Sequence, residues 1–496
     1  MPDYTIRTTR GQPLRTRIVC TLGPASRDPA IVAELIDAGM SVARLNMSHG
    51  DHEVHRATFE TVRKVAAARR REVAIMFDLS GPKIRLREVP APFELTPGDT
   101  IDFIRGDAPC TPQALTCTYA RLIDDLSVNE PVFVNDGAIH LRVTAKHPDR
   151  VTCVCEIGGL VTSRKGINLP GTSVSSPALT EKDIADLEFG ARLGADIFAL
   201  SFVRSPDEVN DLRGRLQALH SKALIVSKIE KPQALSRLEA IIEASDAIMV
   251  ARGDLGIEMP VESVPLHQKR IIRECSAALK PVIVATQVLE SMVENPTPTR
   301  AEVSDIANAI EDGCDALMLS AETASGKHPV AAARTMARVA RDVERVLAPK
   351  EDAEKFLARR SGDALRKAMV MGAAMIAEPL GAKFIVIRSE SGVTARYMSK
   401  IRGGCAILVV HHDPAVLRRH ALYWGVLPVH TRTDEEAPDM EEELRQLARV
   451  ILDEGLVSIG DRIVVVSRYP WGEQLPPNNI RTLRVGDALG ALPEPE

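Results

Sequence analysis

Two short stretches of the sequence end in charged residues whose types and spacing could do chemistry. The first, at 224–230, is an apolar run that ends in Lys228 and Glu230. The second, at 247–256, has the same character and runs into Asp254. Such runs with β-branched residues are typical of strands buried on both faces. Because side chains alternate along a strand, Lys228 and Glu230 should leave it on the same face.

These three charged groups suit one kind of ligand. Carboxylates supply the hard oxygen atoms that Mg²⁺ prefers, and an ammonium group neutralises a phosphoryl group in transfer. The pattern therefore favours a site for a magnesium–phosphate substrate. A plain salt bridge between Lys228 and Glu230 at the rim of the fold is the structural alternative.

Further polar residues stand at the ends of other apolar runs. Arg44 and Arg85 would add local positive charge for a phosphate. Gly253 and Asp254 begin a turn whose free N–H groups could receive a carboxylate, and Thr286 offers a neutral hydroxyl. Each of these residues alone could simply satisfy loop backbone. Together they indicate a site, because they agree across five predicted strands.

The elements that must position these residues alternate between strand and helix. Eight strands are predicted, at 17–23, 42–50, 73–78, 196–203, 223–230, 246–252, 281–286 and 315–320. Helices with recognisable caps lie between them, as in the capping boxes that begin at Thr180 and Thr299. This alternation forces a parallel sheet, so the fold class is α/β and the strands predict a closed (β/α)8 TIM barrel. Active sites of such barrels lie at the C-terminal ends of the strands.

The alternation is interrupted after the third strand and ends after the eighth. Residues 87–172 show short alternating β segments and turn residues, which predict an inserted small β-barrel domain. A separate open α/β domain is predicted from about 348 onwards. The predicted domains are therefore 1–86 and 173–347 for the barrel, 87–172 for the insertion and 348–496 for the C-terminal domain.

Composition argues against several classes of function. The chain of 496 residues has a formal net charge of -5 and only 3% aromatic residues, so neither a basic face nor stacking platforms for nucleic acid are expected. No apolar run reaches the roughly 18 residues of a membrane-spanning helix, and no signal peptide is recognisable. The eight cysteines form no Cys-x-x-Cys pair. We expect a cytoplasmic protein with reduced cysteines and no membrane partner.

Five blocks of the sequence resemble the signature segments of the pyruvate kinase family. They are 16–26 (TRIVCTLGPAS), 43–50 (ARLNMSHG), 227–230 (SKIE), 251–256 (ARGDLG) and 285–292 (ATQVLESM). The blocks span nearly the whole predicted barrel, in the expected order. The resemblance implies transfer of a phosphoryl group from phosphoenolpyruvate to ADP, then protonation of the enolate, which yields pyruvate and ATP in glycolysis. It also implies Mg²⁺ or Mn²⁺ as cofactor.

The resemblance implies a role for each matched residue. Lys228 would stabilise the phosphoryl group in flight, and Arg44 would bind phosphate. Glu230 and Asp254 would bind the metal. The implied pyruvate-carboxylate positions are Gly253, Asp254 and Thr286, and the nucleotide positions are Asn46, His49, Arg85 and Lys165. The insertion then becomes a lid that closes over the nucleotide.

The proton donor to the enolate is not fixed by these matches. Thr286 acting through a water is preferred over Lys228, with Ser320 and Glu322 nearby in the arrangement of the family.

The chain departs from the family pattern after its third strand. Where the family commonly has a glutamate near a bound potassium ion, this chain has Lys83. A tethered ammonium could take the charge role of that ion beside Asn46, Ser48 and Asp78. We therefore expect no requirement for K⁺. The alternative is a surface lysine beside an intact potassium site.

The C-terminal domain contains a loop at 388–395 that combines hydroxyl groups with a glycine turn before a helix. The resemblance implies a binding loop for a phosphorylated effector, formed by Ser389, Ser391, Gly392 and Thr394. Simple helix capping by Ser391 is the alternative. A homotetramer is expected by analogy with the family.

Two other functions remain open on the sequence alone. One is a lyase or aldolase that handles an enolate with a magnesium ion, but it gives no reason for the inserted domain, Arg85 or Lys165. The other is a catalytically silent scaffold or sensor. The presence of Lys228, Glu230, Asp254 and Thr286 argues against it. The sequence leaves open the identity of an effector, cooperativity and nucleotide preference.

Overall fold

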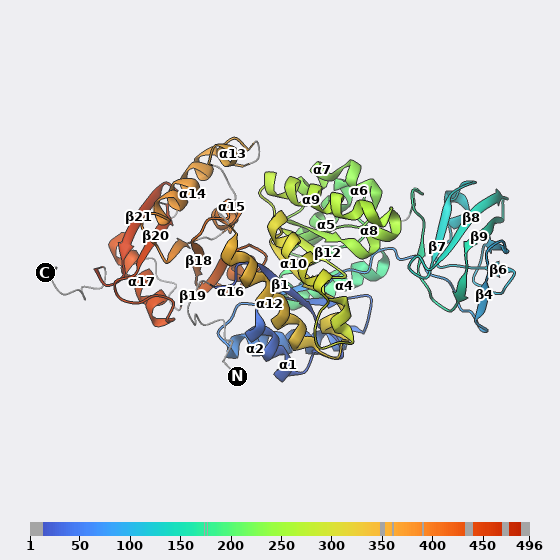
Figure 1. The fold of residues 1–496 in the computed structure, drawn as a ribbon, viewed down its shortest axis with the longest axis horizontal. Helices are drawn as coiled ribbons and strands as arrows, with labels where there is room; N and C mark the ends of the chain where they lie inside the picture. Colours follow the sequence, from blue (N-terminus) through green and yellow to red (C-terminus); the bar gives the residue numbers. More distant parts are fainter. Residues whose placement is uncertain are drawn as a thin grey trace.

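A computed structural model describes the chain at 13–172, 174–175, 177–347, 353–359, 362–388, 391–431, 440–468 and 476–487. Three units lie side by side along its long axis (Figure 1). The barrel is in the middle, the inserted β domain at one end and the C-terminal α/β domain at the other. None of the described helices is long and apolar enough to cross a membrane.

The central unit is a closed barrel of parallel strands, which confirms the predicted fold class. Around the barrel the strands follow the order β1-β16-β15-β14-β13-β12-β3-β2. Their bounds are Arg17–Thr21 (β1), Met40–Asn46 (β2), Ala74–Asp78 (β3), Ile197–Leu200 (β12), Leu224–Ile229 (β13), Ala247–Ala251 (β14), Val282–Ala285 (β15) and Ala316–Leu319 (β16). Nearly all of their residues are buried, which explains why the strands read as continuous apolar runs.

Helices surround the barrel and begin where the sequence carries capping signals. The capping boxes at Thr180 and Thr299 are both formed. The helical segments are Pro29–Ala38 (α1), His52–Ala68 (α2), Glu181–Leu193 (α4), Pro206–Ala218 (α5), Pro232–Ser236 (α6), Leu238–Ala244 (α7), Arg252–Glu258 (α8), Val264–Ala277 (α9), Arg300–Asp312 (α10), Ala321–Ala324 (α11) and Pro329–Val346 (α12), with short 3₁₀ turns at Val261–Ser263 and Glu290–Val293.

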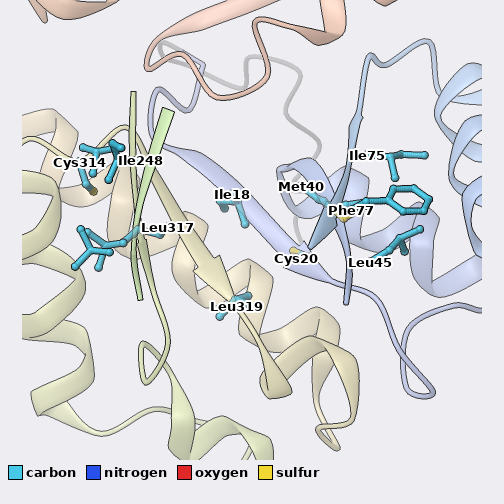
Figure 2. Packing of buried hydrophobic residues seen from close by; sticks show 14 of the residues in the cluster. Ile18, Cys20, Met40, Leu45, Ile75, Phe77, Ile248, Cys314, Leu317 and Leu319 are labelled. Carbon is cyan, nitrogen blue, oxygen red and sulfur yellow. The ribbon is translucent and has the colours of Figure 1, made fainter. Parts of the chain in front are cut away.

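The main core lies between the strands and the ring of helices. Figure 2 shows part of it, with Ile18 and Cys20 from β1 and Phe77 from β3 among the packed side chains. Helix α4 approaches this layer closely because it carries a glycine at position 190. A Cβ there would lie 2.9 Å from atoms of both Phe77 and Phe198.

The inserted domain consists of two small sheets. A six-stranded sheet has the order β11-β7-β8-β9-β5-β6, and a two-stranded sheet pairs β10 with β4. The elements are Phe93–Leu95 (β4), Thr100–Ile104 (β5), Ala114–Leu115 (β6), Leu122–Asp125 (α3), Pro131–Val134 (β7), Ile139–Lys146 (β8), Arg150–Ile157 (β9), Gly159–Val161 (β10) and Ile167–Asn168 (β11). We call this domain the lid. Two chain segments, 79–92 and 169–180, connect it to the barrel.

The C-terminal unit is an open sheet with the order β19-β18-β17-β20-β21. Its elements are Ala353–Leu357 (α13), Ala364–Ala377 (α14), Phe384–Arg388 (β17), Val393–Ile401 (α15), Ala406–His411 (β18), Pro414–Arg418 (α16), Val426–His430 (β19), Met440–Asp453 (α17), Arg462–Ser467 (β20) and Asn479–Arg484 (β21). The last strand is antiparallel to β20 and was not expected from the sequence.

Buried ionic contacts join this unit to the barrel. The Lys400 ammonium at the end of α15 lies 2.6 Å from Asp315 Oδ2, just before β16. Arg402 lies 3.2 Å from the other carboxylate oxygen, and Asp315 is fully buried. Arg17 in β1 donates hydrogen bonds to the carbonyl oxygens of Ala421 and Val426 at 3.1 and 3.0 Å. The two units therefore share a boundary at which these charged side chains are buried.

Candidate active site

The end of β13 brings Lys228 and Glu230 together, as the alternation of side chains predicts. Lys228 Nζ lies 3.0 Å from Glu230 Oε1 and 3.3 Å from Asp78 Oδ1, at the end of β3. It also donates a hydrogen bond to Ser201 Oγ, just after β12, at 2.8 Å. Three neighbouring strands thus converge on one ammonium group. Little solvent reaches it, because only 12% of the Lys228 side chain is exposed and Glu230 is fully buried.

Burial and charge act against each other on these groups. Burial lowers the pKa of Lys228, but Asp78 and Glu230 outweigh that effect, so its pKa is raised above the usual value. Burial raises the pKa of Glu230 to about 7, although Lys228 opposes this shift. For Asp78 burial is outweighed by Lys228 and Arg44, and its pKa is lowered. Lys228 is therefore a permanent positive charge, while Glu230 favours a further cation beside it.

Arg44 is held by the same carboxylate. Its Nε donates to Asp78 Oδ2 at 2.6 Å, and its Nη1 donates to Thr21 Oγ1 at 2.9 Å. Asp78 therefore fixes both positive groups at the mouth of the barrel. The sequence had suggested Asp78 only as an oxygen near a monovalent ion. Its partnership with Arg44 and Lys228 was missed, although its place at the end of a predicted strand was a usable signal.

The ends of β14 and β15 form the other side of the site. The backbone N–H of Gly253 donates to Thr286 Oγ1 at 2.7 Å, and that hydroxyl donates to the Ala285 carbonyl at 2.6 Å. Thr286 and Gln287 have positive φ values of 69° and 52°. Strained backbone of this kind is common at active sites.

Glu230 and Asp254 fit a divalent metal. Asp254 lies in the first turn of α8, half-buried, and its charge acts on both Glu230 and Lys228. Oε1 of Glu230 is buried, and within the described part of the chain its one polar partner is the Lys228 ammonium, 3.0 Å away. A buried carboxylate oxygen with a single cationic neighbour, beside a second carboxylate, is a favourable place for a further cation. Mg²⁺ is typically bound by one or two carboxylates, with substrate oxygens and water completing its shell.

Comparison with known proteins agrees with this geometry. A family model described as the barrel domain of pyruvate kinase matches residues 14–333, and one for its alpha/beta domain matches 367–483. The chain is 41% identical over 479 residues to the pyruvate kinase of Mycobacterium intracellulare, covering 95% of this chain and 99% of that protein. The chain belongs to the pyruvate kinase family.

Other relatives support the same assignment. Pyruvate kinases of Staphylococcus epidermidis and Geobacillus stearothermophilus are 39% and 40% identical over 481 residues, covering 96% of this chain and 81% of theirs. The prediction that the protein is a phosphotransferase is thereby confirmed.

Two of the positions expected to face the nucleotide lie on adjoining segments between the barrel and the lid. Arg85 forms a backbone bridge with Gly166, next to Lys165, and its Nη1 donates to the Arg164 carbonyl at 3.1 Å. Asn46 and His49 lie on the barrel instead, at and just after the end of β2. The nucleotide-binding role of all four residues remains a prediction.

Lys83 lies between the barrel and the lid. Its ammonium is 3.9 Å from Asp136 Oδ1, in the turn between β7 and β8. Ser48, one of the residues expected beside Lys83, donates a hydrogen bond from its Oγ to Ser80 Oγ at 3.2 Å. Within the described part of the chain, no hydrogen bond or ion pair joins Lys83 to Asn46, Ser48 or Asp78. Its role in place of K⁺ is therefore still a prediction.

Glu322, one of the two residues expected near the proton donor, is fully buried after β16. Its two oxygens accept hydrogen bonds from the N–H groups of Leu289 and Ser320, at 3.1 and 2.7 Å. It thus fixes the loop that follows Thr286 against the end of β16.

The predicted effector loop is described only in part. Ser389 lies outside the described residues. Helix α15 begins after Gly392, whose φ is 77°, so Gly392 rather than Ser391 is its N-cap. Thr394 Oγ1 accepts a hydrogen bond from Arg366 at 3.0 Å.

Sequence reasoning also missed the pair Ser201 and Phe202. Ser201 accepts from Lys228, and the backbone N–H of Phe202 donates to Glu230 Oε2 at 2.6 Å. A serine at the end of a predicted strand could have been noticed. The contact of Phe202 could not have been recognised from the sequence, because its donor is a backbone N–H group.

Proposed function

We propose that the protein transfers the phosphoryl group of phosphoenolpyruvate to ADP, with a divalent metal held by Glu230 and Asp254 and without a requirement for K⁺. The observation that carries this proposal is the convergence of Lys228 and Glu230, with Asp78, at the mouth of the barrel. A buried ammonium whose charge is permanent suits a phosphoryl group in transfer.

The positive groups would bind and orient the phosphoryl group. Lys228 and Arg44 are fixed by hydrogen bonds and ion pairs before substrate arrives, so little reorganisation is needed during the reaction. Because its pKa is raised, Lys228 would act through its charge rather than as a proton donor. When bound, a divalent metal would neutralise charge on the substrate and hold its oxygens in place.

The carboxylate of the substrate would lie near Gly253 and Thr286. The Gly253 N–H now donates to Thr286 Oγ1 at 2.7 Å and would turn to the substrate carboxylate when the Thr286 hydroxyl moves. The Thr286 hydroxyl would move from its present partner, the Ala285 carbonyl, to substrate or water. We favour it, acting through a water, as the route of the proton to the enolate.

The remaining assignments follow the family by analogy. We place Asn46, His49, Arg85 and Lys165 on the nucleotide, with the lid excluding water from the reaction. We also propose a glycolytic, cytoplasmic homotetramer that responds to a phosphorylated effector at the loop before α15.

An assay of pyruvate release tests the reaction and the ion requirement together. With phosphoenolpyruvate and Mg²⁺ present, pyruvate should form only when ADP is added, and equally fast in tetramethylammonium or potassium salt. Release of pyruvate without ADP, with inorganic phosphate as the other product, would instead indicate hydrolysis of the substrate. A large drop in rate without K⁺ would show that Lys83 does not replace the ion.

A further inference from the structure

Phe202 has a backbone conformation that bulky residues rarely adopt. It follows β12 in the chain, and its φ is 55°. This left-handed region is adopted readily by glycine and by few other residues. Such strain persists only where the surrounding structure holds it, and it is found preferentially at functional sites.

The strained peptide points at the proposed metal ligand. The N–H of Phe202 donates to Glu230 Oε2 at 2.6 Å, while the other oxygen of Glu230 faces Lys228. The residue before it, Ser201, accepts from Lys228 and donates to the Leu79 carbonyl. One short loop therefore orients both charged residues at the end of β13.

The ring of Phe202 lies against the first connection between barrel and lid. Gly81, in that connection, has a φ of 67°, and a Cβ there would stand 2.8 Å from Phe202 Cδ2. The ring also lines a cavity of about 430 Å³ between the barrel and both lid connections. Ile84 from the first connection and Leu169 from the second are among the other lining residues.

A second chain of contacts ties the ring to β11, the lid strand that leads directly into the second connection. The Lys231 ammonium lies over the ring, 5.7 Å from its centroid, and 2.5 Å from Glu258 Oε1. The same Glu258 oxygen accepts a hydrogen bond from Asn168 in β11 at 3.0 Å. Asn168 and Glu258 are both buried. The ring is thus linked to the first lid connection and, through β11, to the start of the second.

We propose that Phe202 is a positioning residue that links the position of the lid to the geometry of the metal ligand Glu230. Its ring lies between the two lid connections and holds the peptide whose N–H orients the carboxylate. This inference rests on the proposed role of Glu230 in binding the metal. Partners that orient a metal ligand typically contribute tenfold to a hundredfold to metal affinity.

Binding of Mn²⁺ to the substrate-free enzyme, followed by electron paramagnetic resonance, tests the link without relying on activity. Phe202→Ala should weaken Mn²⁺ binding about tenfold, and Phe202→Leu should weaken it less, because part of the apolar contact remains. Phe93→Ala is a matched control, since Phe93 is also a half-buried phenylalanine but lies in β4 of the lid. Its Mn²⁺ affinity should equal that of the unmodified enzyme.

A double-mutant cycle then tests whether a change at Gly81, in the first lid connection, affects Mn²⁺ binding through the ring of Phe202. Gly81→Ala places a methyl group against the ring and should weaken Mn²⁺ binding in the unmodified background. In the Phe202→Ala background the same change should have a smaller effect, because the ring is gone and only the contact with Ser201 Cβ at 3.0 Å and the positive φ remain unfavourable. A purely structural role of Phe202 would lower stability without this coupling in metal affinity.

The outcomes separate this inference from the proposed function. If Glu230→Gln weakens Mn²⁺ binding but Phe202→Ala does not, the link through Phe202 is wrong and the metal site stands. Additive effects in the cycle would likewise overturn the link. If Glu230→Gln leaves Mn²⁺ binding unchanged, the proposed metal site itself is wrong. The proposed link between the lid and Glu230 through Phe202 is then wrong as well.

Discussion

Lys228 is a charged residue in a site from which most water is excluded. Its ammonium is satisfied by Asp78, Glu230 and Ser201, so it can stay buried without losing its proton. This arrangement makes the positive charge available before substrate binds. We therefore expect Lys228 to make the largest single electrostatic contribution to the reaction.

Removal of this charge should abolish most of the turnover. Lys228→Ala should lower kcat by about 10³-fold or more, with a smaller change in KM, because the lost interaction acts mainly in the transition state. Lys327→Ala is the control, since Lys327 is exposed and pairs with the equally exposed Glu294 at the surface. Steady-state kinetics with unchanged circular dichroism would check both. A near-normal rate for Lys228→Ala would contradict the role of Lys228 in phosphoryl transfer.

The raised pKa of Glu230 predicts how metal binding depends on pH. Burial stabilises the protonated form, so the pKa of about 7 lies above that of an exposed glutamate. The proton must leave before a metal binds. Affinity for Mn²⁺ in the absence of substrate should therefore rise about tenfold from about pH 6 to about pH 8.

The same titration with Glu230→Gln is the control for this dependence. That variant should bind Mn²⁺ weakly at every pH, with a flat profile. A wild-type profile that is equally flat would contradict the assignment of Glu230 as a ligand that must lose its proton.

The main charged residues of the site could be predicted because each ends a strand. Strand periodicity placed Lys228 and Glu230 on one face, and barrel topology brought the ends of β3, β13 and β14 to one mouth. Contacts made by backbone groups, such as the Phe202 N–H, depend on loop conformation and not on side-chain type. They could not be predicted from the sequence.

At the scale of elements, strand and helix alternation was sufficient to predict the barrel. Buried strands are continuous apolar runs, and capping boxes mark helix starts, so both signals are local. The strand β21 was missed because it pairs antiparallel with β20 at the edge of the sheet, and its residues are partly or fully exposed. Its sequence carries no continuous apolar run.

The close approach of α4 to the barrel gives a prediction at this scale. In Gly190→Ala the new methyl group would stand 2.9 Å from Phe77 and Phe198 atoms. Overpacking of this kind costs about 1–3 kcal/mol, more than the roughly 1 kcal/mol that alanine gains in a helix. We expect a lower urea midpoint for barrel unfolding.

Gly214→Ala in α5 is the matched control. A Cβ there meets nothing within 4 Å, so only the gain in helix propensity remains and the midpoint should rise slightly. If both alanine variants shift the midpoint in the same direction, packing at Gly190 is not what requires the glycine.

At the scale of the whole molecule, the lid and the C-terminal domain contact opposite ends of the barrel (Figure 1). On the lid side, Gly81 of the first connection lies beside Phe202, and Asn168 of β11 donates to Glu258 at the end of α8. The C-terminal domain contacts the barrel around Asp315, which precedes β16 and also accepts the Val282 N–H at 2.7 Å. The sequence predicted the separate units, but it could not predict these contacts between residues far apart in the chain.

The buried contact between Lys400 and Asp315 should hold the C-terminal domain to the barrel. Lys400→Ala leaves the fully buried Asp315 with one fewer cation, and loss of one partner of a buried pair costs about 3–5 kcal/mol. We expect calorimetry to show an earlier, separate transition of the C-terminal domain.

Lys383→Ala provides the comparison, because Lys383 forms a more exposed pair with Asp461 in the same domain. Such pairs contribute only about 0–1 kcal/mol, so a single unchanged transition is expected. Equal effects of the two variants would show that the contact at Asp315 does not join the domains.

The proposed metal and phosphoryl positions can be located by anomalous scattering from Mn²⁺ in crystals grown with phosphoenolpyruvate. One strong peak is expected between the carboxylates of Glu230 and Asp254, with the phosphoryl group of the substrate next to the Lys228 ammonium. A peak elsewhere, or a phosphoryl group remote from Lys228, would contradict the proposed positions.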